Sequence, residues 1–247
     1  MLSHIDFTLA IVGEKAAGKD AVAELICDAS GAWTMRYSDP IRVAHLLCEW
    51  SIPLQSPEQL GACTAQVFTE CGWTTRGAKT FDAAFYAERE TVPPTTFALQ
   101  DLGNSLKRQF GPEVLTRVVL QVADVLHKDI VVVNGIRNPA EFGSFEELLA
   151  GKHALVGVRA DLNLRKKRFL EGRRRIGDPV TEEDFLRLDR RDQGEGEPPD
   201  GQQVAKCLEL IDSGNMVRNN GTLDQLRTWV RAWYGTLAHR HGLPMRK

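Results

Sequence analysis

The residues whose types and spacing specify chemistry most clearly are those at 13–20, which read Gly-Glu-Lys-Ala-Ala-Gly-Lys-Asp. A glycine, four residues and then Gly18-Lys19 form the pattern of a phosphate-binding loop. Glycine lets the backbone curl so that several N–H groups face one phosphate, and the following helix N-terminus and Lys19 add positive charge. We therefore expect a nucleoside triphosphate to lie on Gly13, Glu14, Lys15, Ala16, Ala17, Gly18, Lys19, Asp20 and Ala21, with Lys19 also serving catalysis.

Asp20 stands where the common pattern has serine or threonine, whose hydroxyl binds Mg²⁺. A carboxylate can bind the same ion, although it adds negative charge near the phosphates. Asp20 is thus either a magnesium ligand or only an acid in the first turn of a helix expected over Ala21–Asp28.

A second acid, Asp39, follows the strand-like run Trp33–Tyr37 in the segment Tyr37-Ser-Asp-Pro40. Ligands of parallel sheets gather at the carboxyl ends of the strands, so Asp39 is expected to face the phosphate loop. There it could accept a proton from the attacking oxygen or bind Mg²⁺. The alternative is an N-cap, since proline favours the first helical position.

The run Asp129–Val133 continues into Asn134-Gly-Ile-Arg137. Asn134 stands where an aspartate often orders magnesium; an amide can bind the metal but cannot act as a base. The fork of Arg137 suits the oxygens of an acceptor phosphate and of the transferred group. A surface arginine paired with Glu141 is the alternative.

Further cations lie in two segments. Gln100–Arg108 indicates a helix with a polar face, from which Gln100 and Arg108 are expected to join Arg137 in binding the acceptor. Lys107 and Arg108 either hold a substrate phosphate or are simply solvated. Residues 163–203 are rich in arginine and suggest an arm that closes over transferring phosphates, followed by a flexible Gly/Pro-rich loop. A solvated helix or a nucleic-acid patch are the alternatives, but nearby acids almost cancel the charge.

The elements that must position these residues alternate between strand-like and helical patterns. The five strand-like runs are Phe7–Val12, Trp33–Tyr37, Asp129–Val133, Ala154–Arg159 and Met216–Arg218. A continuous β-branched run such as Ile130–Val133 is typical of a central parallel strand buried on both faces. This alternation predicts a three-layer α/β/α fold in a single domain.

Residues 51–96 are long, turn-rich and aromatic, and they interrupt this alternation. They form either a helical substrate lobe, within an acceptor-binding region over 50–120, or an irregular excursion. After the turn Asn219-Asn-Gly221, Thr222 and Gln225 predict a capping box at the start of the last helix.

Composition excludes several classes of protein. The formal charge of −2 excludes a wholly basic chain, and five cysteines without a CxxC pair make a zinc site unexpected. No apolar stretch reaches membrane length, and residues 1–6 lack the basic region of a signal peptide. We expect a cytosolic (cytoplasmic) protein that does not enter a membrane; the oligomeric state stays open.

The order of motifs resembles that of P-loop nucleotide kinases, in the branch that contains dephospho-coenzyme A kinase, phage deoxynucleoside monophosphate kinases and related archaeal proteins of uncertain activity. The motifs are Gly13–Asp20, Ser38-Asp-Pro40, Leu99-Gln-x-Leu-Gly103, Asn134-Gly-Ile-Arg-Asn-Pro139 and Asn219-Asn-Gly221. The archaeal group is also similar at Arg173–Pro179, Glu182–Phe185, Asp189–Asp192 and Gln202–Val204. The resemblance covers nearly the whole chain except 50–96.

The resemblance implies a five-stranded parallel sheet, ATP with Mg²⁺, a helical acceptor lobe and an arginine-rich lid. It places Asp39 near the acceptor hydroxyl or phosphate, makes Arg173 or Arg174 a lid arginine, and sets Asn219 and Gly221 near the adenine.

Three functions stay open. The first is phosphorylation of a nucleotide or nucleotide-like acceptor, above all a (deoxy)nucleoside monophosphate. The second is phosphorylation of a modified base in DNA, which the neutral total charge disfavours, and the third is nucleotide binding without turnover.

Overall fold

The computed structural model describes residues 2–70, 83–172 and 181–246, and its centre is a five-stranded sheet. The strands are β1 (Phe7–Gly13), β2 (Trp33–Arg36), β3 (Ile130–Ile136), β4 (His153–Arg159) and β5 (Met216–Arg218), in the order β2-β3-β1-β4-β5. Every neighbouring pair is parallel. The predicted α/β fold with five parallel strands is confirmed, because all five strand-like runs form strands of this one sheet.

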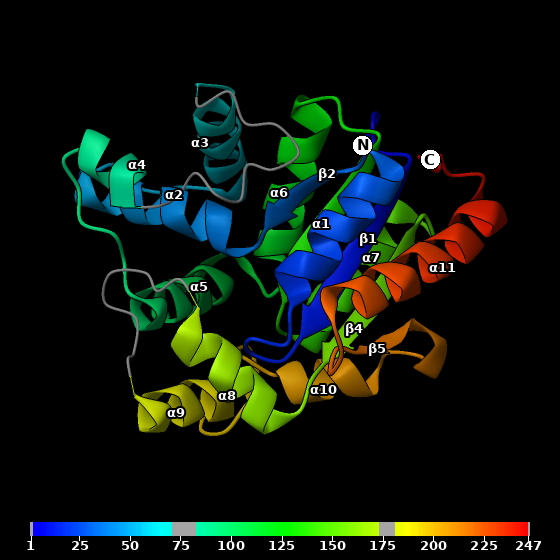
Figure 1. The fold of residues 1–247 in the computed structure, drawn as a ribbon. Helices are drawn as coiled ribbons and strands as arrows, with labels where there is room; N and C mark the ends of the chain where they lie inside the picture. Colours follow the sequence, from blue (N-terminus) through cyan, green and yellow to red (C-terminus); the bar gives the residue numbers. More distant parts are fainter. Residues whose placement is uncertain (1, 71–82, 173–180, 247) are drawn as a thin grey trace.

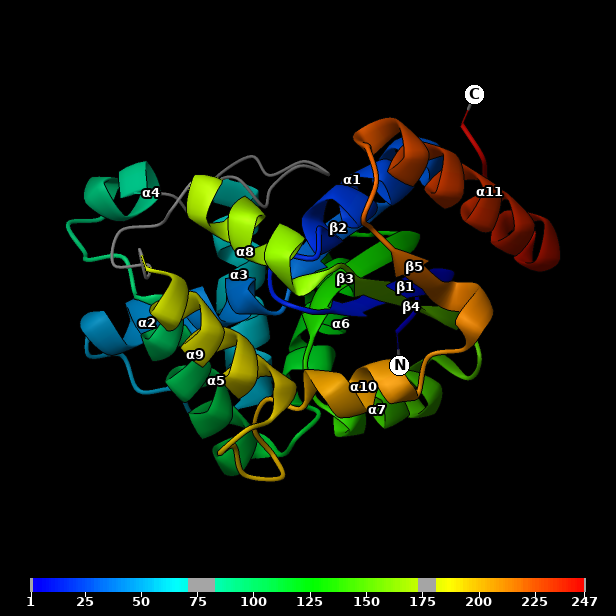
Figure 2. The same ribbon diagram turned by 60° about the horizontal axis from the view of Figure 1, so that its bottom comes forward.

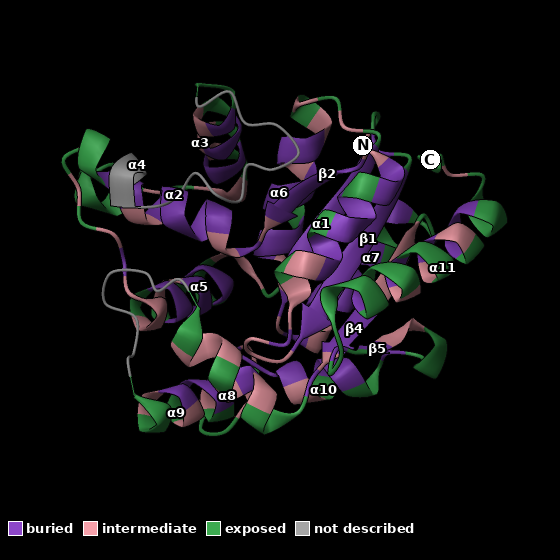
Figure 3. Ribbon diagram, viewed as in Figure 1, coloured by how far each residue is buried: buried purple, intermediate pink, exposed green. Residues whose placement is uncertain are grey.

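Both faces of the sheet are covered by helices, so the central strands β1 and β3 are almost continuously buried (Figure 1, Figure 3). Helices α1 (Lys19–Ser30) and α11 (Leu223–His241) pack on one face, over side chains such as Leu9 and Val132. Helices α6 (Val114–Val125), α7 (Pro139–Leu149) and α10 (Val204–Glu209) pack on the other, over Ala10 and Val133. Successive residues of one strand point to opposite faces, so each strand contributes to two cores.

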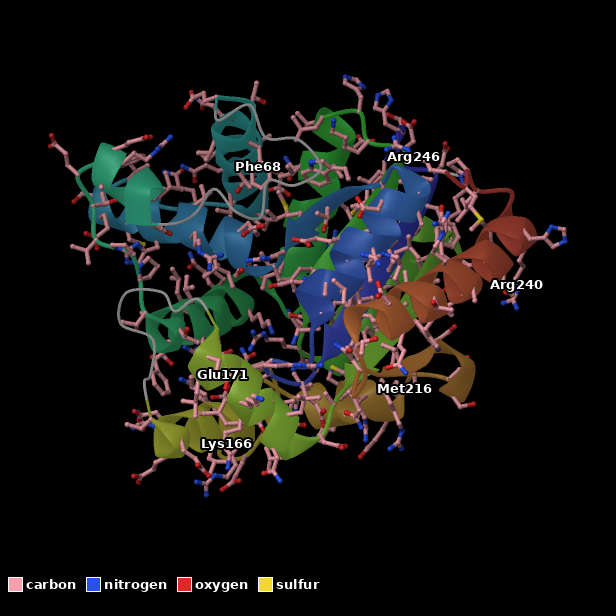
Figure 4. The ribbon with its side chains drawn as sticks, viewed as in Figure 1. Phe68, Lys166, Glu171, Met216, Arg240 and Arg246 are labelled. Carbon is pink, nitrogen blue, oxygen red and sulfur yellow. The ribbon has the colours of Figure 1, made fainter. Side chains whose placement is uncertain are left out.

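A group of helices beyond β2 extends one side of the sheet. It consists of α2 (Ser38–Glu49), α3 (Pro57–Glu70), α4 (Ala83–Glu88) and α5 (Thr96–Phe110). Helix α3 packs on α2 and α6, and its buried Phe68 meets the ring of Trp33 at a centroid distance of 5.8 Å (Figure 4). Within 51–96, the described part therefore contains the helices α3 and α4, of which α3 packs on the core; a substrate lobe stays a prediction.

The arginine-rich arm forms α8 (Leu162–Glu171) and α9 (Glu182–Gln193), which lie together at the carboxyl edge of the sheet (Figure 2). Lys166 and Glu171 on α8 mark this edge in Figure 4, at the opposite end of α1 from Arg246, whose backbone N–H donates to the Ala29 carbonyl. The arm and the phosphate loop thus lie at the same edge of the sheet, where the strands have their carboxyl ends.

The loop 194–203 that follows α9 was expected to be flexible, and here the structure differs. The Asn138 side-chain amide donates to the carbonyls of Pro199 and Gly201, both at 2.8 Å, and Glu197 accepts from Asn104 at 2.8 Å. These bonds attach the loop to α7 and α5. Glycine and proline shape its turns, but they do not leave it unattached.

Helix α11 begins as predicted: Thr222 and Gln225 form the capping box. Along the described part of the chain, none of the helices combines the length and apolar character that a membrane crossing needs.

Candidate phosphate-binding site

A cavity of about 420 Å³ lies at the carboxyl edge of the sheet, within the size range of ligand sites. The phosphate loop and the ends of β2 and β3 line its phosphate end, and the apolar side chains of Ile41, Leu99 and Leu115 also belong to the lining. The described lining includes six cationic side chains and three carboxylates, which are Lys15, Lys19, Arg36, Lys107, Arg137 and Arg168 with Asp20, Glu141 and Asp192. A protein of net charge −2 therefore concentrates positive charge here, as an anionic ligand requires.

The glycines of the phosphate loop are required by close contacts. A Cβ at Gly13 would lie 2.4 Å from the Val158 carbonyl oxygen, and one at Gly18 would lie 2.3 Å from the Asn219 amide nitrogen. Gly18 also adopts a φ of 97°, a conformation that favours glycine, just before α1 begins. The Asn219 amide donates to the Ala17 carbonyl at 2.8 Å, so this predicted adenine contact also holds the loop in shape.

Lys19 folds back over the loop, and its ammonium donates to the carbonyls of Gly13 at 2.7 Å and Glu14 at 2.8 Å. Burial lowers the pKa of Lys19 to about 8; Arg137 also lowers it, while Asp192 and Asp20 raise it. The ammonium therefore lies at the phosphate end of the cavity and can exchange carbonyl partners for phosphate oxygens.

Asp192 on α9 is the residue of this site that the sequence reasoning missed. It is 2% exposed, and its carboxylate accepts from Arg137 and from the Gln100 amide at 2.6 Å. Its second oxygen lies 3.6 Å from the Lys15 ammonium. Burial alone would raise the pKa of Asp192, but Arg137, Lys15 and Lys19, together with the Gln100 hydrogen bond, hold it below its usual value. Asp192 is therefore an anion among the cations of the phosphate loop.

A signal for Asp192 does exist in the sequence. Phe185, Leu188, Asp189 and Asp192 recur at intervals of three and four residues, and all four are buried in α9. Acids on the apolar stripe of a helix cannot be solvated, so they must face cations of the protein. The phosphate loop supplies them.

Arg137 reaches the cavity as expected, and the alternative of a side-chain pair with Glu141 is wrong. The guanidinium bonds to Asp192 and to Gln202 at 3.2 Å, whereas Glu141 accepts from the backbone N–H of Arg137 at 2.8 Å. Glu141 is instead paired with Lys107 at 2.8 Å, with both side chains almost fully buried. Gln100 lines the cavity, as predicted for an acceptor contact.

Arg108 is exposed and is not among the described residues that line the cavity, so its expected contact with the acceptor gains no support from the cavity and stays a prediction. Its neighbour Lys107 faces inward because Gln100, Gly103 and Lys107 share one face of α5 at helical spacing. Only part of the predicted acceptor region, 50–120, lines the cavity. Helices α5 and α6 supply lining residues from Thr96 onwards, and the described part of 51–95 supplies none.

Asp20 and Asn134 meet at the end of the phosphate loop. The Asn134 amide donates to Asp20 at 2.7 Å, and Arg36 lies 3.1 Å from the other carboxylate oxygen. The amide oxygen of Asn134 is buried with no hydrogen-bond partner among the described residues. One carboxylate and one free amide oxygen fit Mg²⁺, which usually takes one or two protein ligands along with phosphate and water.

Asp39 is placed differently from the expectation. Its carboxylate is buried beside Arg42 at 3.2 Å, and it accepts from the backbone N–H of Arg36 at 2.9 Å. It is not among the described lining residues, and α2 begins at Ser38 with Tyr37 as N-cap, so Asp39 is not the cap either. A role as base or magnesium ligand stays a prediction.

Two arginines of α8 differ in their partners. Arg165 is buried and makes a bidentate pair with Asp189, while its guanidinium also donates to the Lys15 carbonyl at 3.2 Å. Arg168 lines the cavity, and one of its nitrogens is buried with no hydrogen-bond partner among the described residues. The predicted lid arginines Arg173 and Arg174 lie outside the described residues.

Four residues that line this cavity have a buried polar atom with no hydrogen-bond partner among the described residues, although other such atoms lie elsewhere. The four residues are Arg36, Gln100, Asn134 and Arg168. Such atoms cost free energy unless water or a ligand satisfies them. The cavity therefore has the features of a binding site for a polar ligand.

A second cavity, of about 660 Å³, lies beside β5 and the start of α11. It is lined by Arg218, Asn219, Gly221, Thr222 and Trp229, among others. Because the Asn219 amide also bonds to the phosphate loop, this cavity adjoins the loop on the side of β5.

Comparison with known proteins gives partial matches in sequence. A UPF0200 protein from Hyperthermus butylicus is 35% identical over 111 residues, which are 44% of this chain and only 58% of that protein. A UPF0200 protein from Pyrococcus horikoshii is 25% identical over 144 residues, or 57% of this chain and 72% of that protein. No protein-family model matches the chain.

Solved structures of similar extent share little sequence with this chain. The Thermus thermophilus protein TT1252 is 17% identical with a TM-score of 0.49, covering 95% of this chain and 98% of that chain. A sugar kinase from Janibacter sp. HTCC2649 is 10% identical with a TM-score of 0.42, covering 93% and 94% of the two chains.

Proposed function

We propose that this protein is an ATP-dependent phosphotransferase that acts on a nucleotide or nucleotide-like acceptor, above all a (deoxy)nucleoside monophosphate. The observation that carries the proposal is that Lys15, Lys19 and Arg137 line one cavity together with the apolar side chains of Ile41, Leu99 and Leu115. The cations fit the phosphates of two substrates, and the apolar side chains fit a nucleobase.

Phosphoryl transfer needs positioning and charge stabilisation more than covalent chemistry. Lys19 would bind the terminal phosphates, and Arg137 would bridge the transferred group and the acceptor phosphate. Arg168 would add a charge from α8, and Arg173 and Arg174 stay candidates for the same task. Gln100 would contact the acceptor.

The carboxylates support an acceptor whose attacking oxygen is already ionised. Asp20, Glu141 and Asp192 line the cavity, and each is paired with a cation: Arg36, Lys107 and Arg137 respectively. A hydroxyl acceptor benefits from a general base, whereas a phosphate oxygen carries its own charge. This arrangement favours a nucleoside monophosphate over the hydroxyl of dephospho-coenzyme A or of a modified base.

Asp20 and the free amide oxygen of Asn134 are the groups that would hold Mg²⁺. The ion would supply Lewis-acid stabilisation of the negative charge on the phosphates. The adenine would lie in the second cavity, near Asn219 and Gly221, on the other side of the phosphate loop from the acceptor.

A coupled assay of ATP turnover tests the proposal. The panel contains ribo- and deoxynucleoside monophosphates, dephospho-coenzyme A and oligonucleotides with a hydroxymethylated base. The proposal predicts turnover with one or more monophosphates. Turnover only with the oligonucleotides would instead favour the DNA kinase, and ATP binding without any turnover would favour a regulatory protein.

A further inference from the structure

We propose that Asp192 is the internal counter-ion of the phosphate site: it positions Lys15 and Arg137 while the site is empty and competes with ligand phosphate for both. No role for this residue follows from the phosphate-loop pattern, because it lies on α9, far along the chain.

The geometry assigns both carboxylate oxygens of Asp192 to the site. One accepts from Arg137 and from Gln100, and the other faces the Lys15 ammonium at 3.6 Å. Arg137 comes from the end of β3 and Lys15 from the phosphate loop. One carboxylate therefore joins cations from two separate elements at the phosphate end of the cavity.

The position of Asp192 is fixed from behind. Its neighbour Arg191 bonds to Asp101 on α5 at 2.6 Å and also to Glu197, which accepts in turn from Asn104 and from the backbone N–H of Gln202. Three residues earlier, Asp189 holds Arg165, which donates to the Lys15 carbonyl. The end of α9 is therefore attached to several other elements, so the Asp192 carboxylate is a fixed part of the cavity wall.

Two opposite effects follow from a fixed anion among phosphate-binding cations. The carboxylate offsets their mutual repulsion and holds them in a defined arrangement, which favours the transition state. It also repels a bound polyphosphate and pairs with Lys15 and Arg137, two of the cations that the polyphosphate would contact. Both effects weaken ground-state binding. Removing the charge should strengthen polyphosphate binding and slow turnover. Loss of a purely structural residue would instead weaken the binding and also slow the turnover.

Asp192→Asn removes the charge at nearly constant shape. We expect inorganic triphosphate, titrated calorimetrically, to bind about tenfold or more tightly to this variant than to the native chain. The maximal rate of phosphoryl transfer should fall about tenfold or more. Asp184→Asn is the matched control, because it removes one carboxylate charge from a solvent-exposed pair with Arg187 on the same helix and should leave both quantities unchanged.

Unchanged or weaker triphosphate binding in folded Asp192→Asn protein would overturn the counter-ion, and an unchanged maximal rate would overturn its positioning role. If Asp192→Asn does not fold, the double variant Asp192→Asn/Arg137→Gln is compared with the single variant Arg137→Gln. Both variants keep Lys15 and Lys19, so the comparison still measures the effect of the Asp192 charge. Equal triphosphate affinity of the two variants would overturn the proposal. Only the rate measurement rests on the proposed function. A native chain that transfers no phosphoryl group would refute that function while the triphosphate titration still decides the counter-ion.

Discussion

Two acids one helical turn apart on α9 bind arginines in different ways. Asp189 forms a bidentate pair with Arg165, and both side chains are at least nine-tenths buried. Asp192 pairs with Arg137, whose side chain is 29% exposed and faces the cavity. The first pair reaches the phosphate loop through the Lys15 carbonyl, and the second through the Lys15 ammonium.

This difference separates stability from function on one face of one helix. Breaking a buried pair leaves an uncompensated charge, so the residues around Asp189 should determine whether the loop folds. The pair at Asp192 borders a cavity that phosphate can enter, so its cations can exchange partners. The following changes test that division, beginning with the largest expected effect.

Asp189→Asn should lower the free energy of unfolding by about 3 kcal/mol, because the buried Arg165 guanidinium loses its bidentate partner and keeps only the Glu14 carboxylate, 3.4 Å away. Chemical denaturation measures this quantity. The matched control is Asp184→Asn, which breaks an exposed pair with Arg187 on the same helix and should cost less than about 1 kcal/mol. Equal losses in the two variants would show that burial does not distinguish the pairs.

Lys19→Ala should reduce phosphoryl transfer by about 10²–10³-fold, the usual effect of losing one preorganised charge contact at the transition state. The free energy of unfolding should change by only about 1 kcal/mol, since the ammonium bonds to loop carbonyls. Native turnover in the purified variant would refute the role of Lys19.

Asp39→Asn examines a third buried pair. The amide can still accept from the Arg36 N–H, but the charge beside Arg42 is lost, so stability should fall by about 1–3 kcal/mol. Because Asp39 is not among the described cavity-lining residues, the maximal rate of the folded variant should stay near the native value. A large fall in maximal rate at unchanged ATP affinity would instead restore Asp39 as a base.

Amide hydrogen exchange separates the two halves of the arm. On adding ATP, Mg²⁺ and acceptor, exchange should slow about tenfold in 165–171, where Arg168 gains phosphate contacts. It should change much less in 188–203, which the bonds of Glu197 and Asn138 already hold. Uniform exchange in 165–171 with and without ligand, beside clear protection of 13–19, would show that α8 does not close over the site.

Arg108→Ala should have the smallest effect, within about 0.5 kcal/mol in stability, because this exposed arginine lies outside the described lining. Gln100→Ala, its counterpart on the inner face of α5, should raise the KM of the acceptor. If Arg108→Ala alone raised that KM, the placement of α5 would be wrong.

The fold and the phosphate loop were predictable from the sequence because their signals are local. A β-branched run such as Ile130–Val133 and the spacing of Gly18 and Lys19 each specify their structure over a few residues. The capping box of α11 is equally local. These predictions needed no knowledge of distant contacts.

The site needed contacts between distant segments. Whether Lys107 or Arg108 faces inward depends on how α5 packs, and that Arg137 meets Asp192 rather than Glu141 depends on where α9 docks. Glycines and prolines predicted a flexible loop at 194–203, but in the structure this loop is attached. The side-chain amide of Asn138, far along the chain, donates to carbonyls of the loop. Acids on the buried stripe of α9 were a signal in the sequence for Asp192, in addition to the resemblance at Asp189–Asp192.

The most direct test of the central claim is binding of adenosine–nucleoside pentaphosphates, in which five phosphates join an adenosine to a second nucleoside. If ATP and a monophosphate lie on either side of the phosphate loop, one such molecule should occupy both sites. Calorimetry should then show one ligand per chain, bound at least about 10²-fold more tightly than ATP when the second nucleoside is the right one. Binding no tighter than ATP for every nucleoside tried, or two ligands per chain, would contradict a phosphotransferase with adjoining donor and acceptor sites.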